Sequence, residues 1–208
     1  MEVATEGIRH TAAHQGFHHE IVALTGRFQP FHSDHLDLAL EALRLSRHLL
    51  IGITNPDARS LRALPDNRHR HLASANPFSY LERVRMIRAA LEAASVAAQR
   101  FEIVPFPLET PEVCAAYIPR GTPQLVRVYS EWERTKARRL REAGYPVLLL
   151  TRAEKRISAS RIRAAIASSE PWESQVPPGV KQVLLEAGER ALRKRCAGGL
   201  ARARLVEG

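Results

Sequence analysis

The sequence predicts a Rossmann-like α/β fold in a single domain: a five-stranded parallel sheet with helices on both faces. Five short apolar runs alternate with segments of helical periodicity along the chain. Strands buried on both faces read as continuous apolar runs, and the crossovers of a parallel sheet need helices on each side. The chain has 208 residues, 45% of them hydrophobic, which suits one domain with a full core.

The first half of the chain predicts a strand–helix–strand unit and then a loop. The first strand is predicted over Glu20–Thr25 and the second over His48–Thr54. Between them Leu36, Leu40 and Leu43 recur at helical spacing, which predicts a helix. The polar segment that follows is interrupted by prolines and is rich in arginine and histidine, so we expect a long loop there.

The second half repeats the alternation. Ser79 and Glu82 have the spacing of a capping box before an apolar stripe, which predicts the start of a helix. The other predicted elements are a strand over Phe101–Pro105, a short helix over Glu112–Ile118, a strand over Gln124–Tyr129, a helix from Trp132 to Ala143 and a strand over Pro146–Leu150.

The two ends of the chain differ from the middle. Residues 1–18 lack periodicity and predict a flexible leader, residues 19–188 predict the folded domain, and residues 189–208 predict a short helix and a basic, frayed tail. Apolar runs are too short for a membrane span, and the order of a secretory signal is missing. The two cysteines lie far apart, so we expect a reducing, cytoplasmic setting.

The net charge of +9 and the pI near 10.3 bear on the kind of partner. Such a charge suits a nucleic-acid binder, yet the arginines are spread over many predicted helices and form no basic stripe interleaved with aromatics. Many of them are typical of solvated helix faces. The composition therefore favours small polyanions over nucleic acid as partners.

The turn after the first strand is the first candidate binding site. Gly26, Arg27 and Phe28 follow the strand, and His32 and His35 stand where the next helix begins. Free backbone N–H groups and the positive end of a helix dipole attract phosphate at such a turn, and two imidazoles add to this. An H-x-x-H pair alone also occurs in surface histidines and metal sites.

A second helix start follows the fifth predicted strand. Ser158 and Ser160 lie there after a short basic loop, and Arg163 follows within one turn. Hydroxyls, backbone N–H groups and a guanidinium can hold phosphate oxygens, whereas the plainer alternative is that the serines only cap the helix.

Four segments together resemble the nucleotidyltransferase superfamily with HxGH and ISSTxIR motifs, most closely its archaeal-type nicotinamide mononucleotide adenylyltransferase branch. GRFQPFHSDHL resembles the first motif and ISASRIR the second, and the likeness covers about residues 20–188. NPFSYLERVRMI resembles an NPFT-x-x-ER-x-x-MI segment, and PWESQVPPGVKQVL resembles a W-x-x-x-VP-x-x-V tail. Four ordered motifs are far more specific than one.

The resemblance implies transfer of a nucleoside monophosphate from a nucleoside triphosphate to an acceptor oxyanion, with pyrophosphate released and Mg²⁺ bound with the triphosphate. It implies that His32 and His35 contact the phosphates in the transition state. Arg27, Ser158, Ser160 and Arg163 would cradle the triphosphate. No protein general base is expected, because the acceptor is already an anion.

Three departures from the family pattern point to specificity. Asp34 replaces the glycine of HxGH, and Trp132 follows the fourth strand near the expected base site, where it can stack on a base or pack. The loop between Asn55 and Asn76 is longer than in the adenylyltransferases. It is either a solvated loop or a lid whose arginines hold a small anionic acceptor. The four candidates are Arg59, Arg62, Arg68 and Arg70.

The sequence around this loop also resembles phosphonate-pathway relatives that join CMP to phosphonoformate. We therefore expect a nucleotidyltransferase that favours CTP and a small phosphonate or phosphate acceptor. The alternatives are an ATP-dependent nicotinamide or nicotinate mononucleotide adenylyltransferase and a nucleotide-binding protein without activity. A homo-oligomer is compatible with the sequence, and no interface can be assigned from it.

Overall fold

The computed structural model describes residues 17–57, 75–151 and 156–204. Its five strands form one wholly parallel sheet in the order β3-β2-β1-β4-β5. The strands are β1 (His19–Gly26), β2 (Ser46–Ile53), β3 (Phe101–Pro105), β4 (Gln124–Val128) and β5 (Val147–Thr151). The predicted five-stranded Rossmann-like sheet is confirmed, and each predicted strand falls within two residues of an observed one at either end.

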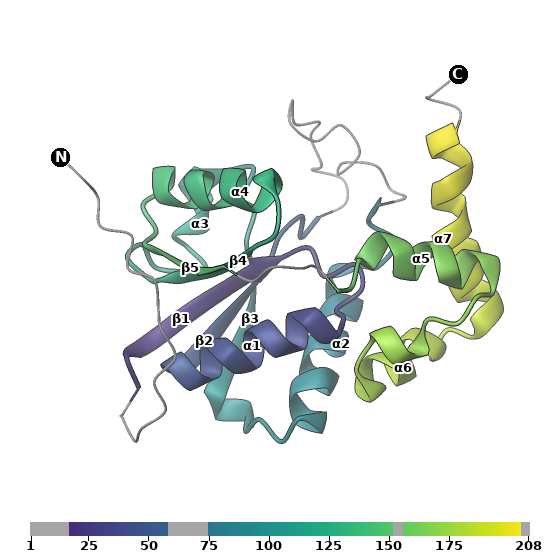
Figure 1. The fold of residues 1–208 in the computed structure, drawn as a ribbon, viewed down its shortest axis with the longest axis horizontal. Helices are drawn as coiled ribbons and strands as arrows, with labels where there is room; N and C mark the ends of the chain where they lie inside the picture. The colour runs from purple at the N-terminus through teal and green to yellow at the C-terminus, as the bar shows by residue number, and fades with distance from the viewer. Residues whose placement is uncertain (1–16, 58–74, 152–155, 205–208) are drawn as a thin grey trace.

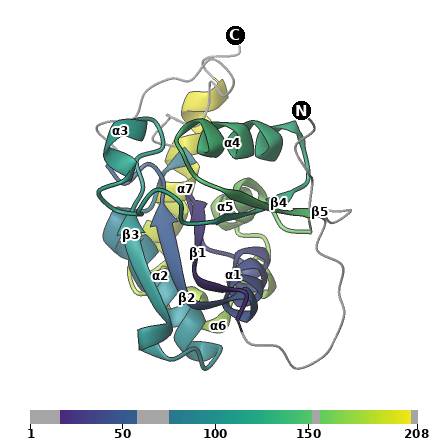
Figure 2. The ribbon, with the colours of Figure 1, turned by 90° about the vertical axis from the view of Figure 1, so that its left-hand side faces the viewer.

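Helices cover both faces of the sheet (Figures 1 and 2). They are α1 (Ser33–Leu45), α2 (Tyr80–Ala93), α3 (Pro111–Cys114), α4 (Glu131–Glu142), α5 (Ala159–Ser168), α6 (Pro178–Leu185) and α7 (Glu189–Arg204). In both views α3 and α4 lie on one side of the sheet, while α1, α2 and α6 lie on the other. Right-handed crossovers between parallel strands produce this two-sided cover.

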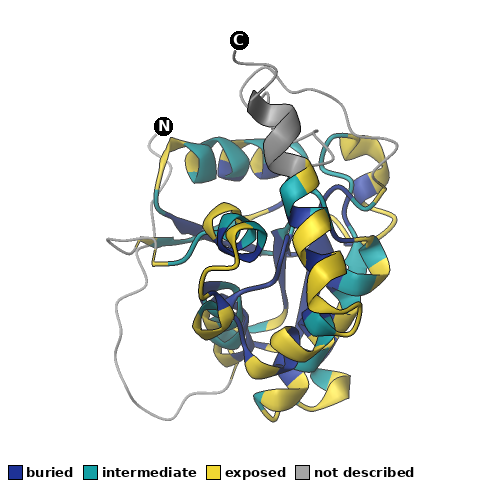
Figure 3. Ribbon diagram, turned by 90° about the vertical axis from the view of Figure 1, so that its right-hand side faces the viewer, coloured by how far each residue is buried: buried dark blue, intermediate teal, exposed yellow. Residues whose placement is uncertain are grey.

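The core is divided by the sheet into two clusters. The larger one contains Leu24, Ile51 and Leu125 from the strands and packs against α1, α2, α5, α6 and α7. The smaller contains Val126 and Tyr145 and packs against α3 and α4. Successive strand residues point to opposite faces, so Leu125 and Val126 enter different clusters. Figure 3 shows the buried residues enclosed by helices with exposed outer faces.

The predicted capping box at the start of α2 is confirmed. The Glu82 N–H donates to the Ser79 hydroxyl at 3.3 Å, and the Ser79 N–H donates to the Glu82 carboxylate at 2.8 Å. These bonds satisfy two donors that the first turn of a helix otherwise leaves unpaired.

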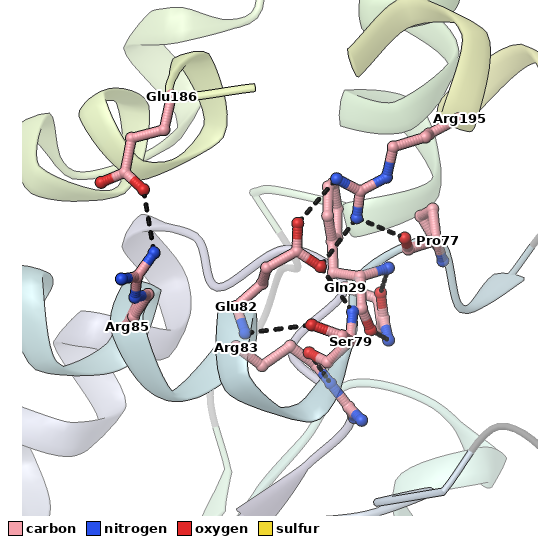
Figure 4. Close-up of polar contacts among 9 residues, drawn as sticks. Gln29, Pro77, Ser79, Glu82, Arg83, Arg85, Glu186 and Arg195 are labelled. Atoms are coloured by element: carbon pink, nitrogen blue, oxygen red, sulfur yellow. Dashed lines mark hydrogen bonds and ion pairs between the residues drawn. The ribbon is translucent and has the colours of Figure 1, made fainter. Parts of the chain in front are cut away.

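The C-terminal segment was expected to be a short helix with a frayed tail, and the structure shows a longer helix that is part of the core. Helix α7 has sixteen residues, and its Leu192 and Cys196 are buried in the larger cluster against α5. Its Arg195 forms two hydrogen bonds with Glu82, of 2.6 and 2.8 Å, and a third with the Pro77 carbonyl at 2.7 Å (Figure 4). Leu192 and Cys196 lie four positions apart, on one face of α7, and their burial anchors the helix.

Residues 1–16 of the predicted leader lie outside the described part of the chain. The Phe17 ring lies against Arg100, whose guanidinium carbon is 4.9 Å from the ring centroid. Within the described residues, every helix is too short or too polar to cross a membrane.

Glu82 provides a test of how α7 is anchored. Burial acts to raise the pKa of Glu82, but hydrogen bonds from Arg195 and Ser79 outweigh it, so the pKa lies below its ordinary value of 4.5. A lowered pKa contributes stability above the ordinary value, and this stability is lost as the pH falls through the lowered one. We expect Glu82→Gln to lower the free energy of unfolding by about 1 kcal/mol at neutral pH and by less in acid.

Urea unfolding at both pH values measures this difference. The control is Glu186→Gln, which removes one partner of an exposed ion pair with Arg85, 3.1 Å long (Figure 4). Exposed pairs contribute little, so the control should change stability by less than about 0.5 kcal/mol. Equal losses in the two variants would contradict a specific role for Glu82.

Candidate active site

A cleft of about 240 Å³ opens at the carboxyl ends of β1 and β4. The strand order reverses between these two strands, and open α/β sheets bind ligands at such a switch point. The turn before α1, the start of α5 and one face of α4 form its walls. The predicted site residues that line it are Gly26, Arg27, Phe28, His32, Asp34, His35, Trp132, Ser158 and Ser160.

The turn between β1 and α1 is shaped by an aromatic cluster. Phe28 has a positive φ of 53° and is 2% exposed, and its ring folds back over Gly26. A Cβ atom on Gly26 would lie 2.7 Å from this ring, so only glycine fits there. The Phe28 ring also contacts Phe31 and His35, with centroid distances of 5.4 and 5.0 Å. The cluster fixes the direction in which the chain enters α1.

The two histidines of the first motif stack on each other at the entrance to α1. Their ring centroids are 3.6 Å apart and their planes are inclined by 22°. The backbone N–H of His32 donates to Nδ1 of His35 at 3.2 Å. Because that nitrogen accepts, a neutral His35 carries its proton on Nε2, which makes Nε2 a hydrogen-bond donor. Both side chains line the cleft, where this donor suits a phosphoryl oxygen.

Gln29 ties the same turn to the segment before α2. Its side-chain amide donates to the Phe78 carbonyl and accepts from the Phe78 N–H, both at 2.9 Å. Gln29 is 2% exposed, so this pair also satisfies a buried amide. The NPF segment therefore supports the turn between β1 and α1. The sequence analysis assigned Gln29 no role.

Arg83 holds the two loops beside the cleft together. Its guanidinium is 2% exposed and donates to the carbonyls of Arg27, Thr54 and Asn55 at 3.1, 2.9 and 2.8 Å. A further bond of 3.2 Å reaches the Ser79 carbonyl within α2. Burial lowers the pKa of Arg83 to about 10, which still leaves it charged at neutral pH. Five fixed donors allow one arginine to cross-link the loops after β1 and β2.

The start of α5 forms the opposite wall, and its serines do not act as simple caps. Ser158 occupies the N-cap position but makes no side-chain cap hydrogen bond. Its hydroxyl instead pairs with that of Ser160 at 2.8 Å, and both residues line the cleft. The predicted alternative of a plain serine cap is therefore wrong for Ser158. The two hydroxyls lie at the start of α5, beside the cleft.

Arg163 lies on α5 and bonds to the turn between β1 and α1. It does not belong to the residues that line the cleft in the described chain. Its Nη1 donates to the Gln29 carbonyl at 2.7 Å, and burial lowers its pKa. Arg163 thereby supports the turn between β1 and α1, and its predicted contact with the triphosphate stays a prediction.

Asp34 faces the segment before α5. It is 5% exposed, and one carboxylate oxygen accepts the Ile157 N–H at 3.0 Å. The other accepts Nε of Arg156 at 3.1 Å. Arg156 also pairs with Asp37 on the outer side, and its pKa is raised by the hydrogen bond to Asp37 and by the charge of Asp34. The carboxylate is thus engaged by two donors at the edge of the cleft.

Helix α4 and strand β4 add three cations that sequence reasoning missed. Lys136 and Arg139 line the cleft together with the predicted Trp132, at positions i, i+4 and i+7 of one helix face. Arg127 lies inside β4, is 8% exposed and donates to the Tyr129 hydroxyl at 3.3 Å. A charge within an apolar strand and a helical i, i+4, i+7 spacing were the available signals.

For Trp132, the two alternatives of stacking on a base and of packing both stay predictions. Its ring lines the cleft, and the Arg139 guanidinium carbon is 5.9 Å from its centroid. Arg59, Arg62, Arg68 and Arg70, the predicted acceptor ligands, lie outside the described residues.

The donors of the cleft suit phosphate oxygens better than a bare metal ion. Within the described residues, no three His, Cys, Asp or Glu side chains gather as metal ligands. Two of the carboxylates at the cleft, Asp34 and Glu133, already accept hydrogen bonds from Ile157 and Ser130. A magnesium ion commonly binds through substrate phosphates and few protein oxygens, so this donor set fits a metal–triphosphate complex.

Comparison with known proteins identifies the family. The cytidylyltransferase-like family matches residues 23–165. The chain belongs to this family. A phosphonoformate cytidylyltransferase from Streptomyces viridochromogenes is 38% identical over 78% of this chain and 89% of that protein. A nicotinamide-nucleotide adenylyltransferase from Thermococcus kodakarensis is 29% identical over 77% of this chain and 80% of that protein.

A solved structure agrees on the fold of this cytidylyltransferase-like chain. It is a bifunctional NMN adenylyltransferase/ADP ribose pyrophosphatase from Francisella tularensis, with a TM-score of 0.62 and 15% identity. The superposition covers 91% of this chain and 57% of that one. At this identity the likeness concerns the fold alone, and it supports the predicted Rossmann-like fold.

Arg83→Lys tests whether the buried arginine maintains the cleft. Lysine keeps the charge but cannot supply the planar fork, so buried carbonyls of Thr54 and Asn55 lose their donor. We expect a loss of about 2–4 kcal/mol in the free energy of unfolding. Urea unfolding measures it, and Arg85→Lys on the exposed face of the same helix should cost less than about 0.5 kcal/mol. Similar losses for the two would contradict the assignment.

Proposed function

We propose that this chain transfers a nucleoside monophosphate from a nucleoside triphosphate, with CTP favoured, to a small phosphonate or phosphate acceptor such as phosphonoformate, and releases pyrophosphate. The observation that carries the proposal is the meeting of two motifs in one cleft. His32 and His35 from the first motif and Ser158 and Ser160 from the second line the same cavity, although more than a hundred residues separate them in the sequence.

The reaction needs positioning and charge stabilisation more than acid–base chemistry. An acceptor oxygen attacks the α-phosphorus in line, a new P–O bond forms, and the bond to the pyrophosphate oxygen breaks. The acceptor is already an anion, so no proton has to be removed by the protein. In this proposal the His35 Nε2–H and the His32 ring stabilise the charge on the phosphoryl oxygens, and Mg²⁺ arrives with the triphosphate.

Other residues of the cleft suit the triphosphate and the base of the nucleotide. Ser158, Ser160 and the start of α5 face the triphosphate, and Arg27 and Lys136 approach from the β1 side. Lys136 also donates a hydrogen bond to the Thr25 carbonyl, which places its ammonium group at the end of β1. Trp132 is positioned to cover the base. Arg163 and Gln29 hold the turn that carries the histidines.

The preference for CTP and a phosphonate follows from the more similar relative. Its 38% identity over most of both chains exceeds the 29% of the nicotinamide-nucleotide adenylyltransferase. The latter supports the second candidate, ATP-dependent transfer to nicotinamide or nicotinate mononucleotide. The two candidates use the same phosphate machinery and differ in the base and the acceptor.

A crossed substrate panel tests the proposal. ATP, CTP, GTP and UTP are each combined with Mg²⁺ and with nicotinamide mononucleotide, nicotinate mononucleotide or phosphonates that include phosphonoformate, and released pyrophosphate is measured. We expect release from CTP with a phosphonate. Release only from ATP with a mononucleotide would replace the first candidate with the second, and no release from any pair would contradict both.

His35→Ala tests the assigned role of the first motif. Removal of a donor to the transition state should lower kcat by about 10²–10³-fold, with a smaller change in the KM for the nucleotide. Pyrophosphate release measures the rate, and circular dichroism checks the fold because His35 packs on Phe28. His48→Ala is the control, since His48 lies near the opposite end of the sheet in β2. A turnover within twofold of the wild type would remove His35 from the site.

A further inference from the structure

The Asp34 carboxylate is the point where the two motifs touch. It lies in the first turn of α1 and reaches the backbone N–H of Ile157, directly before the Ser158–Ser160 pair. Arg156 binds it through two atoms, Nε at 3.1 Å and Nη2 at 2.9 Å. The backbone carbonyl of Asp34 also accepts Nη1 of Arg127 at 3.4 Å. One residue thus connects α1, β4 and the start of α5.

Glycine could make none of the side-chain contacts. With glycine at this position, the Ile157 N–H would lose this acceptor, and Arg156 would keep its ion pair with Asp37, which lies on the exposed side of α1. Hydrogen bonds to an ionised acceptor are stronger than neutral ones. The gap between the histidines and the serines therefore depends on this carboxylate.

The negative charge of Asp34 is partly offset by Arg156, which also pairs with Asp37. A bare carboxylate beside a triphosphate would repel it, but here one oxygen accepts a backbone N–H and the other faces a guanidinium. Arg156 directly precedes Ile157, which lines the cleft. A carboxylate whose charge is partly offset in this way can shape the site and opposes the substrate less than a bare one would.

We propose that Asp34 is a positioning residue that locks the start of α5 onto the first helix and so preorganises the triphosphate site. The inference rests on the proposed function for the identity of the bound ligand. In this proposal the aspartate that replaces the family glycine raises the affinity for the nucleotide. Ser158 and Ser160 are already ordered before the nucleotide binds, so less free energy is spent on ordering them.

Positioning by Asp34 and charge repulsion by Asp34 predict opposite changes in the nucleotide Kd of Asp34→Gly. If Asp34 locks the wall, Asp34→Gly weakens nucleotide binding, and we expect the Kd to rise about tenfold. If Asp34 acts by repulsion, the same change tightens binding. Asp34→Asn keeps one oxygen for the Ile157 N–H and loses the charge, so we expect an increase of about threefold. Mg²⁺ with CTP and Mg²⁺ with ATP are titrated separately into the full chain by calorimetry.

Arg156, the ion-pair partner of Asp34, provides a second variant on the surface of the protein. Its side chain is 65% exposed, so Arg156→Gln should fold normally. In the Arg156→Gln background, Asp34→Asn should weaken binding by less than twofold, because the ion pair is already lost. Independent, additive effects of the two substitutions would overturn the proposal.

A matched control lies on the same helix. Glu41→Gln changes a carboxylate to an amide in an ion pair with Arg44, 2.9 Å long, and this pair is not part of the cleft. We expect its nucleotide Kd to equal that of the wild type. Thermal unfolding of every variant shows whether a change in affinity accompanies a loss of fold, and tighter or unchanged binding in folded Asp34→Gly would overturn the proposal.

A split of the kinetic constants separates positioning from general damage. For Asp34→Gly, the KM for the nucleotide should rise about tenfold, while the acceptor KM and the kcat at saturating nucleotide change less than threefold. The binding titrations need no acceptor, so they hold even if the acceptor panel is silent. Silence in that panel with the expected affinity changes would contradict the proposed function alone, and wild-type protein that binds neither nucleotide would overturn both proposals.

Discussion

The geometry of the cleft depends on one buried guanidinium that cross-links loops from different strands. Arg83 is fixed in α2 by the Ser79 carbonyl and reaches the ends of both β1 and β2 through Arg27 and Thr54. Those carbonyls lie at strand ends, where the regular ladder has stopped and backbone groups need other partners. A buried arginine supplies these donors without a carboxylate, and the loops that shape the site are thereby attached to the helix layer.

Two further contacts extend this scaffold around the phosphate turn. Gln29 pairs with the backbone of Phe78, and Arg163 donates to the Gln29 carbonyl from α5. The Arg195–Glu82 pair then attaches α7 to the same end of α2 (Figure 4). The histidines are therefore carried by a turn that bonds to α2, to the segment before it and to α5, while α7 in turn supports α2. Such rigid support is what positional catalysis requires of a site with little covalent chemistry of its own.

Cations line the cleft, and two of its carboxylates are engaged by hydrogen bonds within the protein. Arg27, Lys136 and Arg139 line the cleft, whereas Asp34 and Glu133 accept hydrogen bonds from the protein. This set of cations suits a strongly anionic ligand. The overall charge of +9 acts in the same direction.

The sequence by itself determined the order of strands and helices, the Ser79 capping box and nine of the residues that line the cleft. These signals are local: apolar periodicity, turn residues and short motifs act within a few positions. The tertiary structure decided how the side chains are used. It attached Arg163 to the Gln29 carbonyl, joined Asp34 to Arg156 across 122 positions and buried α7 in the core.

The physical reason is that a side chain takes its partner from whatever the fold packs beside it. Arg127, Lys136 and Arg139 read as scattered charges in the sequence, and they meet only because β4 and α4 cross the switch point of the sheet. Likewise, a carboxylate in place of a motif glycine has no predictable direction until the Ile157 N–H is brought within 3.0 Å of it. Local patterns fix the elements, and packing between distant elements fixes the chemistry.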